Sequence, residues 1–290
     1  MRPPWTRLSI WSTRGCGAWP GSERDAILRA VAILVIALVT AHAAGAEPPA
    51  LRRVDLDALP WTVLNPQLRI KTVVGQAGTF AFGEFAPGPE RKPHHHTYEQ
   101  INVGLTGTAG VRAAGRPIAL GRLGASFTPN DVEHVLMNTG APSTLVEFQP
   151  VRRLDLLPDR TAVQLPVGAS AAGVPSDWPL VSDLDPNSTG WNDVGAGVRS
   201  KVAKGRASAV TAWHLSEGMR RPHALTVQFS DSGRFLFAIS GSVEIRRGRE
   251  SVRLGARTLI VSPPGDEAPV AAPPSASTLI LQFEAVELPQ

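Results

Sequence analysis

The stretch Gly88-Pro-Glu-Arg-Lys-Pro-His94-His95-His96-Thr-Tyr-Glu-Gln100 carries the strongest structural signal in this sequence. Successive side chains of a β-strand point to opposite faces, so residues two apart share a face. The stretch therefore predicts a strand with two histidines and an amide on one side, and a histidine and a carboxylate on the other. These two faces hold His94, His96, Tyr98 and Gln100, and His95 and Glu99, respectively.

A second stretch, Pro129-Asn-Asp-Val-Glu-His134-Val-Leu-Met-Asn138, brings a third histidine from another strand. Neutral imidazole is the commonest protein ligand for divalent transition metals such as Zn, Fe, Mn and Ni. Three imidazoles and one oxygen donor leave coordination positions open, which suits catalysis or ligand capture. We therefore predict a site for one divalent transition metal ion, held by His94, His96, Gln100 and His134.

Both stretches resemble the two sequence motifs of the cupin superfamily. The first motif is a glycine, a short turn, His-x-His, an acidic or amide residue four positions on, and a later glycine. The second is Pro-x-Gly-x-x-His-x-x-x-Asn, and Asp131 takes the place of its glycine, because aspartate tolerates the left-handed backbone better than most residues. The matching residues are Gly88, His94, His96, Gln100 and Gly107 in the first motif, and Pro129, His134 and Asn138 in the second.

Gln100 stands where most cupins have a glutamate. In this respect the chain resembles the cupins that have the motif His-x-His-x-x-x-Gln, which include those that act on unsaturated uronate sugars. An amide carries no charge, so a bound ion would keep more of its positive field and act as a Lewis acid. Glu99 is an alternative oxygen ligand if a β-bulge reverses the alternation of the strand.

The rest of the chain consists of short β-type runs separated by Gly, Pro, Asn and Asp, which predicts an all-β fold. These runs also repeat within the chain. Together with the resemblance, the repeat predicts two small antiparallel β-barrels of the jelly-roll (double-stranded β-helix) type, the arrangement of a bicupin. The matched positions are Leu68–Lys71 with Val198–Lys201, Gly88 with Gly218, Gly107 with Gly241, Pro129 with Pro263, and Leu145 with Leu279.

The second copy lacks the ligand set of the first. Only one histidine of the first copy meets a histidine in this alignment, and a single imidazole holds an ion poorly. We therefore expect the second barrel to be free of metal. The alignment places His94 on His223, His96 on Leu225, and His134 on Ala268.

The first 46 residues differ in composition from the rest. An arginine-rich beginning, the apolar run Ala30–Ala41 and the exit Ala44-Gly-Ala46 predict a signal peptide, and hence a periplasmic or secreted protein without a membrane partner after cleavage. The leader also holds Cys16, the single cysteine, and most of the net charge of +4, so no disulfide and no nucleic-acid partner is expected. The expected boundaries are 1–46 for the signal peptide, 51–150 for the metal-binding cupin domain, 151–195 for a linker and 196–290 for the degenerate cupin domain.

A small closed barrel has room for one small ligand, so the expected partner is a small-molecule substrate or ligand. The favoured function is a metal-dependent enzyme of isomerase, lyase or ring-opening type acting on a small oxygenated substrate, with Tyr98 as the candidate acid–base residue on the ligand face. The alternatives are a cupin dioxygenase that uses Fe or another redox metal, and a non-catalytic cupin that binds a small molecule or carbohydrate. Homodimerisation stays open. We expect the apolar residues of this barrel to serve the core first and a pocket wall only second, namely Phe80, Phe82, Phe85, Leu105, Phe127, Leu136 and Phe148.

Overall fold

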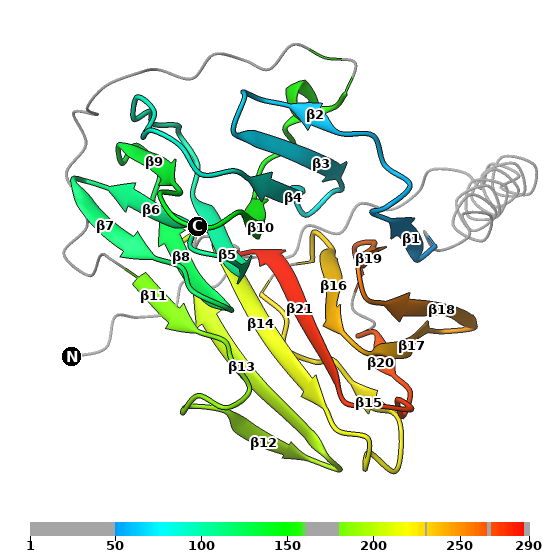
Figure 1. The fold of residues 1–290 in the computed structure, drawn as a ribbon. Helices are drawn as coiled ribbons and strands as arrows, with labels where there is room; N and C mark the ends of the chain where they lie inside the picture. The colour runs from blue at the N-terminus through cyan, green and yellow to red at the C-terminus, as the bar shows by residue number, and fades with distance from the viewer. Residues whose placement is uncertain (1–49, 159, 161–179, 230, 266–267, 287–290) are drawn as a thin grey trace, which may run out of the picture. The chain divides into compact units, whose positions relative to one another are not determined.

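Antiparallel β-strands make up nearly all regular structure in the described part of the chain (Figure 1). A computed structural model describes residues 50–158, 160, 180–229, 231–265 and 268–286. The all-β prediction is therefore confirmed, and the one helical element in these ranges is the 3-10 turn η1 (Leu154–Leu156). No helix among these residues is long and apolar enough to cross a membrane. The predicted signal peptide lies outside the described residues.

The first barrel contains the predicted metal site and is built from a seven-stranded and a three-stranded sheet. The strand order is β11-β8-β5-β10-β4-β3-β2 in the large sheet and β7-β6-β9 in the small one. Its strands are β2 (Thr62–Val63), β3 (Leu68–Val74), β4 (Thr79–Phe85), β5 (Gln100–Thr106), β6 (Gly110–Ala113), β7 (Arg116–Ala119), β8 (Gly124–Thr128), β9 (His134–Met137), β10 (Ser143–Gln149) and β11 (Leu180–Asp183).

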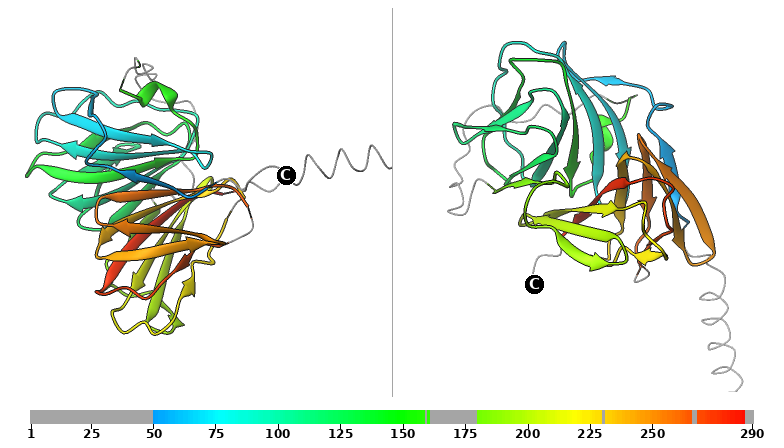
Figure 2. Two further views of the ribbon diagram at one scale, coloured as in Figure 1. Left: turned by 90° about the vertical axis from the view of Figure 1, so that its right-hand side faces the viewer. Right: turned by 60° about the horizontal axis from the view of Figure 1, so that its bottom comes forward.

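The second barrel repeats this plan with a seven-stranded and a four-stranded sheet. The order is β1-β19-β16-β21-β14-β13-β12 in the large sheet and β15-β20-β17-β18 in the small one. Figure 2 shows the strands of the two barrels as separate groups. The strands are β1 (Arg52–Asp55), β12 (Asn192–Gly195), β13 (Val198–Lys204), β14 (Ser208–Leu215), β15 (His223–Ala224), β16 (Arg234–Ser240), β17 (Ser242–Arg247), β18 (Glu250–Gly255), β19 (Thr258–Ser262), β20 (Val270–Ala271) and β21 (Thr278–Ala285).

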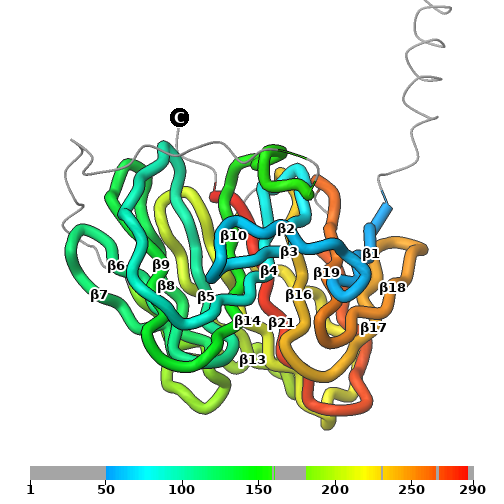
Figure 3. The backbone as a smooth tube through the Cα atoms, turned by 45° about the horizontal axis from the view of Figure 1, so that its top comes forward, coloured from blue at the N-terminus to red at the C-terminus, as the bar shows by residue number. Residues whose placement is uncertain are grey.

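Each barrel includes one edge strand that comes from the other half of the sequence. β1 precedes the first barrel in the chain but pairs with β19 of the second, Arg53 opposite Ile260 (Figure 3). In return β11, from the segment expected to be a linker, pairs with β8 of the first barrel, Leu180 opposite Phe127. The exchange joins the two barrels by backbone hydrogen bonds, and residues 49–290 form one compact unit.

A layer of phenylalanines fills the space between the two large sheets. Phe80 on β4 meets Phe235, Phe237 and Phe283 of the second barrel, with ring centroids 6.1, 5.3 and 5.7 Å apart. Phe80, Phe82, Phe127 and Phe148 are thus core residues, as predicted, but they face the neighbouring barrel and not the interior of their own. Strands such as β4 and β10 are consequently buried on both faces, one toward each core.

The repeat seen in the sequence holds for the first hairpin and slips in the last strand. Leu68 pairs with Phe85 in the first barrel, and Val198 with Leu215 in the second. Gly83 and Trp213 are therefore equivalent positions. Leu145 pairs with Gly83, but Ile280 pairs with Trp213, so the match of Leu145 with Leu279 was wrong by one residue. The second barrel has one additional residue in the loop between β19 and β20, and alignment by sequence could not place it.

Candidate metal centre

Three histidines converge at one end of the first barrel. A backbone bridge joins His94 to His134, with each amide donating to the carbonyl of the other at 2.9 and 2.8 Å. The ligand atoms of His94, His96 and His134 all lie within 4.8 Å of one another. Asp131 adopts φ 59°, the left-handed turn that the sequence predicted for it, and its amide donates to the His96 carbonyl at 2.7 Å. The two motifs therefore meet as expected.

Backbone carbonyls fix the orientation of two of the imidazole rings. Nδ1 of His96 lies 2.6 Å from the Tyr98 carbonyl, and Nδ1 of His134 lies 2.8 Å from the Val132 carbonyl. A carbonyl only accepts, so each Nδ1 carries the proton and each Nε2 presents a lone pair. The Nε2 of His134 is buried and meets no hydrogen-bond partner among the described residues. It is the atom a metal ion would bind.

Gln100 completes the group of donors. Its Oε1 lies 2.9 Å from Nε2 of His96, while its Nε2 donates to Oδ1 of Asn102 at 3.1 Å. With that amide orientation, two lone-pair atoms face each other, and only a positive charge between them makes the contact favourable. Side chains of His94, His96, His134 and Gln100 thus fit a divalent cation, with three nitrogen donors and one neutral oxygen donor.

Burial keeps the histidines neutral. Desolvation, followed by the neighbouring imidazoles, lowers the pKa of His94 to about 4 and that of His134 to about 3. Desolvation also lowers the pKa of His96, opposed by the Gln100 and Tyr98 oxygens, which would accept hydrogen bonds from the protonated ring. Neutral imidazole is the form that binds metals, so near pH 7 the site is ready without proton release from these rings.

Glu99, the alternative oxygen ligand, points away from the histidines. Its carboxylate accepts hydrogen bonds from the backbone amides of Arg206 and Ala207 at 2.9 and 3.2 Å, and from the hydroxyl of Ser208. Arg206 and Ala207 lie in the turn between β13 and β14 of the second barrel, and Ser208 is the first residue of β14. Gln100 and Glu99 therefore point to opposite sides, as predicted, with Gln100 on the histidine side. The predicted strand through the histidines is wrong, because β5 begins at Gln100 and His94 forms only an isolated bridge with His134.

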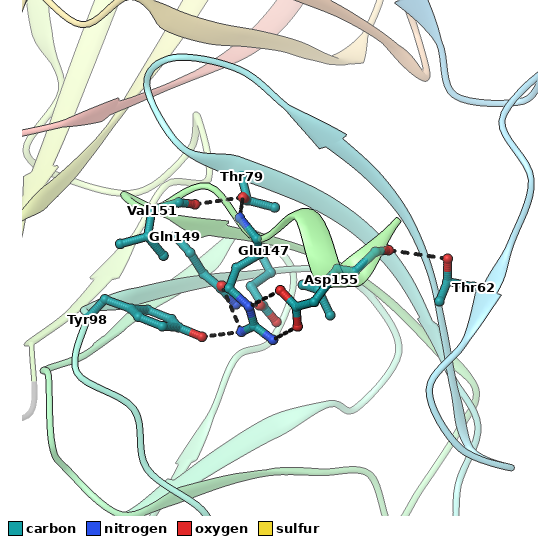
Figure 4. Close-up of polar contacts among 9 residues, drawn as sticks. Thr62, Thr79, Tyr98, Glu147, Gln149, Val151 and Asp155 are labelled. Atoms are coloured by element: carbon teal, nitrogen blue, oxygen red, sulfur yellow. Dashed lines mark hydrogen bonds and ion pairs between the residues drawn. The ribbon is translucent and has the colours of Figure 1, made fainter. Parts of the chain in front are cut away.

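Tyr98 lies at the histidine cluster, but its hydroxyl is engaged. The ring stacks on His96 with a centroid separation of 3.9 Å and an interplanar angle of 7°. The hydroxyl accepts a hydrogen bond from Nη1 of Arg153 (Figure 4). Burial raises the pKa of Tyr98 to about 12. A phenol with so high a pKa is a poor base near neutral pH, so the structure favours a packing role for this ring.

Glu147 is a functional candidate that the sequence reasoning missed. It lies on β10 opposite Asn102, on the strand face that carries Gln100, beside Gln149 (Figure 4). Burial raises the pKa of Glu147 to about 7. A single carboxylate in the otherwise apolar run Leu145–Phe148 was the available signal, because alternation turns it away from the phenylalanine layer and into the barrel.

Arg153 organises the polar groups beside Glu147. Its Nε and Nη2 donate to the Asp155 carboxylate at 2.8 and 2.6 Å, and its Nη1 also reaches Oε1 of Gln149 at 3.4 Å. Thr79 Oγ1 donates to the Val151 carbonyl and anchors the segment that carries the arginine (Figure 4). A fixed guanidinium and a carboxyl group with a raised pKa therefore lie next to each other at this end of the barrel.

The described residues of the second barrel include no counterpart of the ligand set. The amide of Leu225 donates to the Pro269 carbonyl at 2.8 Å, the bond that corresponds to the one from His94 to His134. The equivalent of His94 is thus Leu225, and the match with His223 was wrong by two residues. The sequence alignment had placed all inserted residues of the second copy after this position, whereas one of them precedes it. Gln100 pairs with Thr128 and Arg234 with Ser262, so a buried arginine takes the place of Gln100. The expectation of a metal-free second barrel therefore rests on Leu225 and Arg234 at the positions of His94 and Gln100.

Comparison with known proteins supports the fold and gives no closer relationship. The sequence matches no family model, and no curated protein matches it. Among solved structures, AerE from Microcystis aeruginosa is 17% identical, with 79% of this chain and 97% of that chain covered and a TM-score of 0.56. A putative glyoxylate-induced protein from Pseudomonas aeruginosa is 12% identical, with 83% and 90% covered and a TM-score of 0.62. A mutant of oxalate decarboxylase from Bacillus subtilis is 14% identical, with 83% and 78% covered and a TM-score of 0.58.

Identities this low establish the fold alone. The chain has the antiparallel jelly-roll architecture of cupin proteins, as the motifs predicted, and its first barrel brings together a cluster of three histidines that suits a metal ion.

Proposed function

We propose that this chain is a metal-dependent enzyme of the bicupin type whose first barrel acts on a small oxygenated substrate. One divalent transition metal ion, held by His94, His96, His134 and Gln100, would polarise a substrate oxygen as a Lewis acid. The observation that carries the proposal is the set of convergent lone pairs on the buried Nε2 atoms of His96 and His134 and on Oε1 of Gln100. Isomerisation, lyase or ring-opening chemistry uses such a site.

Glu147 supplies the proton carrier that the sequence did not identify. A carboxyl group with a pKa near 7 can release and take up a proton near neutral pH, which is what a general acid or base needs. Its register partner Asn102 accepts a hydrogen bond from Gln100, so Glu147 lies across the strand from a group that supports a candidate ligand. Arg153 beside it offers a positive charge for an anionic substrate group or transition state.

The names of the similar structures point to a class of substrate worth testing first. Oxalate and glyoxylate, which occur in those names, are small oxygenated acids. We therefore include small oxoacids and uronates in the proposed class, together with hydroxylated aromatics and β-diketones. The leader sequence adds the proposal that the chain is exported to the periplasm or secreted, which detection of a mature chain starting at Glu47 would test.

The decisive experiment combines metal analysis with a substrate screen on protein purified without a histidine tag. We expect about one divalent ion per chain, and turnover that persists without oxygen and with redox-inert Zn. Oxygen consumption in step with substrate, seen only with a redox metal, would replace the Lewis-acid proposal by a dioxygenase. Tight binding of one compound with no turnover of any would make the protein a binding cupin, and absence of bound metal would remove the proposal altogether.

Glu147→Gln separates the proton carrier from the metal site. The variant should retain metal while the pH dependence of turnover around pH 7 disappears, because the amide cannot titrate. Glu90→Gln is the matched control, since Glu90 forms an exposed ion pair with Arg112. An unchanged pH profile in Glu147→Gln would exclude Glu147 from the chemistry.

A further inference from the structure

Glu99 connects the segment that carries His94, His96 and Gln100 to the second barrel. It is 2% exposed and lies between His96 and Gln100 in the chain, with its side chain on the face opposite to theirs. Its carboxylate accepts two backbone amide hydrogen bonds and one hydroxyl hydrogen bond from the residues Arg206–Ser208. Hydrogen bonds to an ionised acceptor are shorter and stronger than neutral ones, so three of them hold this carboxylate firmly.

The turn that receives the carboxylate is shaped for it. Gly205 and Ser208 close the turn with a backbone hydrogen bond of 2.8 Å, and Ser208 is fully buried. A Cβ atom on Gly205 would lie 2.2 Å from Oε1 of Glu99, so only glycine leaves room for the carboxylate. The equivalent of Glu99 in the second barrel is Gly233, which has no side chain. The contact therefore runs in one direction, from the segment of the metal ligands into the other barrel.

From this geometry we propose that Glu99 is a positioning residue for the metal ligands and that the β13–β14 turn of the metal-free barrel is its support. The proposal rests on the metal site of the proposed function. The peptide between Tyr98 and Glu99 contains the carbonyl that accepts the Nδ1 proton of His96 at 2.6 Å. Gln100 follows directly, with Oε1 2.9 Å from Nε2 of the same ring. Holding Glu99 thus fixes both the ring orientation of His96 and the start of the strand that carries Gln100.

A purely structural role would give a different result. If Glu99 only helped to hold the barrels together, its loss would act like a weakening of the phenylalanine layer. Orienting groups around metal ligands act on affinity itself, and their removal typically weakens metal binding about tenfold to a hundredfold. Metal affinity and thermal stability therefore separate the two roles.

The test uses the full chain, stripped of metal and titrated with Zn(II) in competition with a chelator. Glu99→Gln removes the charge, and Gly205→Ala displaces the carboxylate without removing a donor. Both should weaken Zn binding about tenfold or more. Phe283→Leu is the control, because Phe283 packs between the barrels against Phe80 and Phe148. It should lower the melting temperature and leave Zn affinity within about twofold of wild type.

Hydrogen exchange gives a second reading without any metal. Amides of residues 98–100 should exchange faster in metal-free Glu99→Gln than in wild type, and at unchanged rate in Phe283→Leu. Equal Zn affinity in wild type and Glu99→Gln would overturn the positioning role, as would an equal loss of affinity in the control. Wild-type protein that binds no Zn would show the failure of the metal site itself before any variant is compared.

Discussion

The two barrels share one strand plan but fill their interiors differently. In the second barrel Leu236, Ile260 and Trp213 pack into an apolar core with Leu225 and Ile280. The positions of the first barrel that are equivalent to Leu236, Ile260 and Trp213 hold polar or small residues. Asn102 pairs with Ser126 in the first barrel as Leu236 pairs with Ile260 in the second, so Asn102 is equivalent to Leu236 and Ser126 to Ile260. Gly83 is equivalent to Trp213.

The two barrels also differ at the end where the first barrel has its histidines. The first barrel presents neutral imidazoles and Gln100 there, a set of donors without a cation of its own. The second places Arg234 at the position of Gln100, 2% exposed, with its Nη1 donating to the Leu225 carbonyl. Burial lowers the pKa of Arg234, and the nearby Glu284 opposes this effect. A cationic side chain thus takes the place of a neutral oxygen donor, so one fold presents a donor set in one copy and an apolar core with a buried arginine in the other.

The largest expected effect is the loss of metal when two ligands of the first barrel are removed. The His94→Ala/His134→Ala double variant should purify folded but with metal content near zero, because affinity depends on ligand number and preorganisation. The matched control, His214→Ala/His223→Ala, removes two half-buried histidines of the second barrel and should keep the metal. Elemental analysis and circular dichroism decide the outcome, and a full metal complement in the first variant would refute the ligand assignment.

The apolar interior of the second barrel can be broken at its largest side chain. Trp213 is 1% exposed and donates from Nε1 to Oε1 of Gln282 at 3.0 Å. Trp213→Ala should lower the free energy of unfolding by about 3–5 kcal/mol, as truncation of a buried tryptophan typically does. Urea denaturation measures the loss. Metal content per folded chain should stay unchanged, since all candidate ligands lie in the first barrel, and a parallel loss of metal would contradict the separation of roles.

The polar side chains of Asn102, Ser126 and Glu147 form a polar layer inside the first barrel, and its effect on stability should depend on pH. Glu147 has a folded-state pKa near 7 against an ordinary value of 4.5, so the unfolded chain ionises first as pH rises. The contribution of Glu147 to stability therefore falls between about pH 4.5 and pH 7. Glu147→Gln removes this loss. Metal-free variant should equal wild type near pH 4.5 and exceed it by on the order of 2 kcal/mol at pH 8. Urea denaturation at both pH values gives the difference, in which contributions of the histidines cancel, and a constant offset across pH would disprove the raised pKa.

Local patterns predicted which side chains converge, although His94 and His96 precede strand β5 and do not share one strand with Gln100. His94, His96 and Gln100 meet as their spacing required, and His134 follows from its own motif. Contacts between distant parts could not be predicted in the same way. The run Thr79–Phe85 shows that Phe80 and Phe82 share a face, but nothing local says that this face meets Phe235 and Phe237. The exchanged strands β1 and β11 and the support of Glu99 are unpredictable for the same reason, since each depends on residues more than 50 positions away.

The smallest effect compares two serines that are both fully buried. Oγ of Ser126, in the polar layer, meets no hydrogen-bond partner among the described residues, whereas Oγ of Ser208 donates to Glu99. A buried hydroxyl without a partner costs free energy, so Ser126→Ala should leave the free energy of unfolding unchanged or raise it by up to about 1 kcal/mol. Ser208→Ala removes a charge-assisted hydrogen bond and should lower it by about 1–3 kcal/mol. Urea denaturation of the metal-free proteins measures both. Equal destabilisation by the two substitutions would mean that Ser126 is satisfied by water in solution, and that the first barrel keeps its polar layer hydrated where the second has replaced it with Ile260.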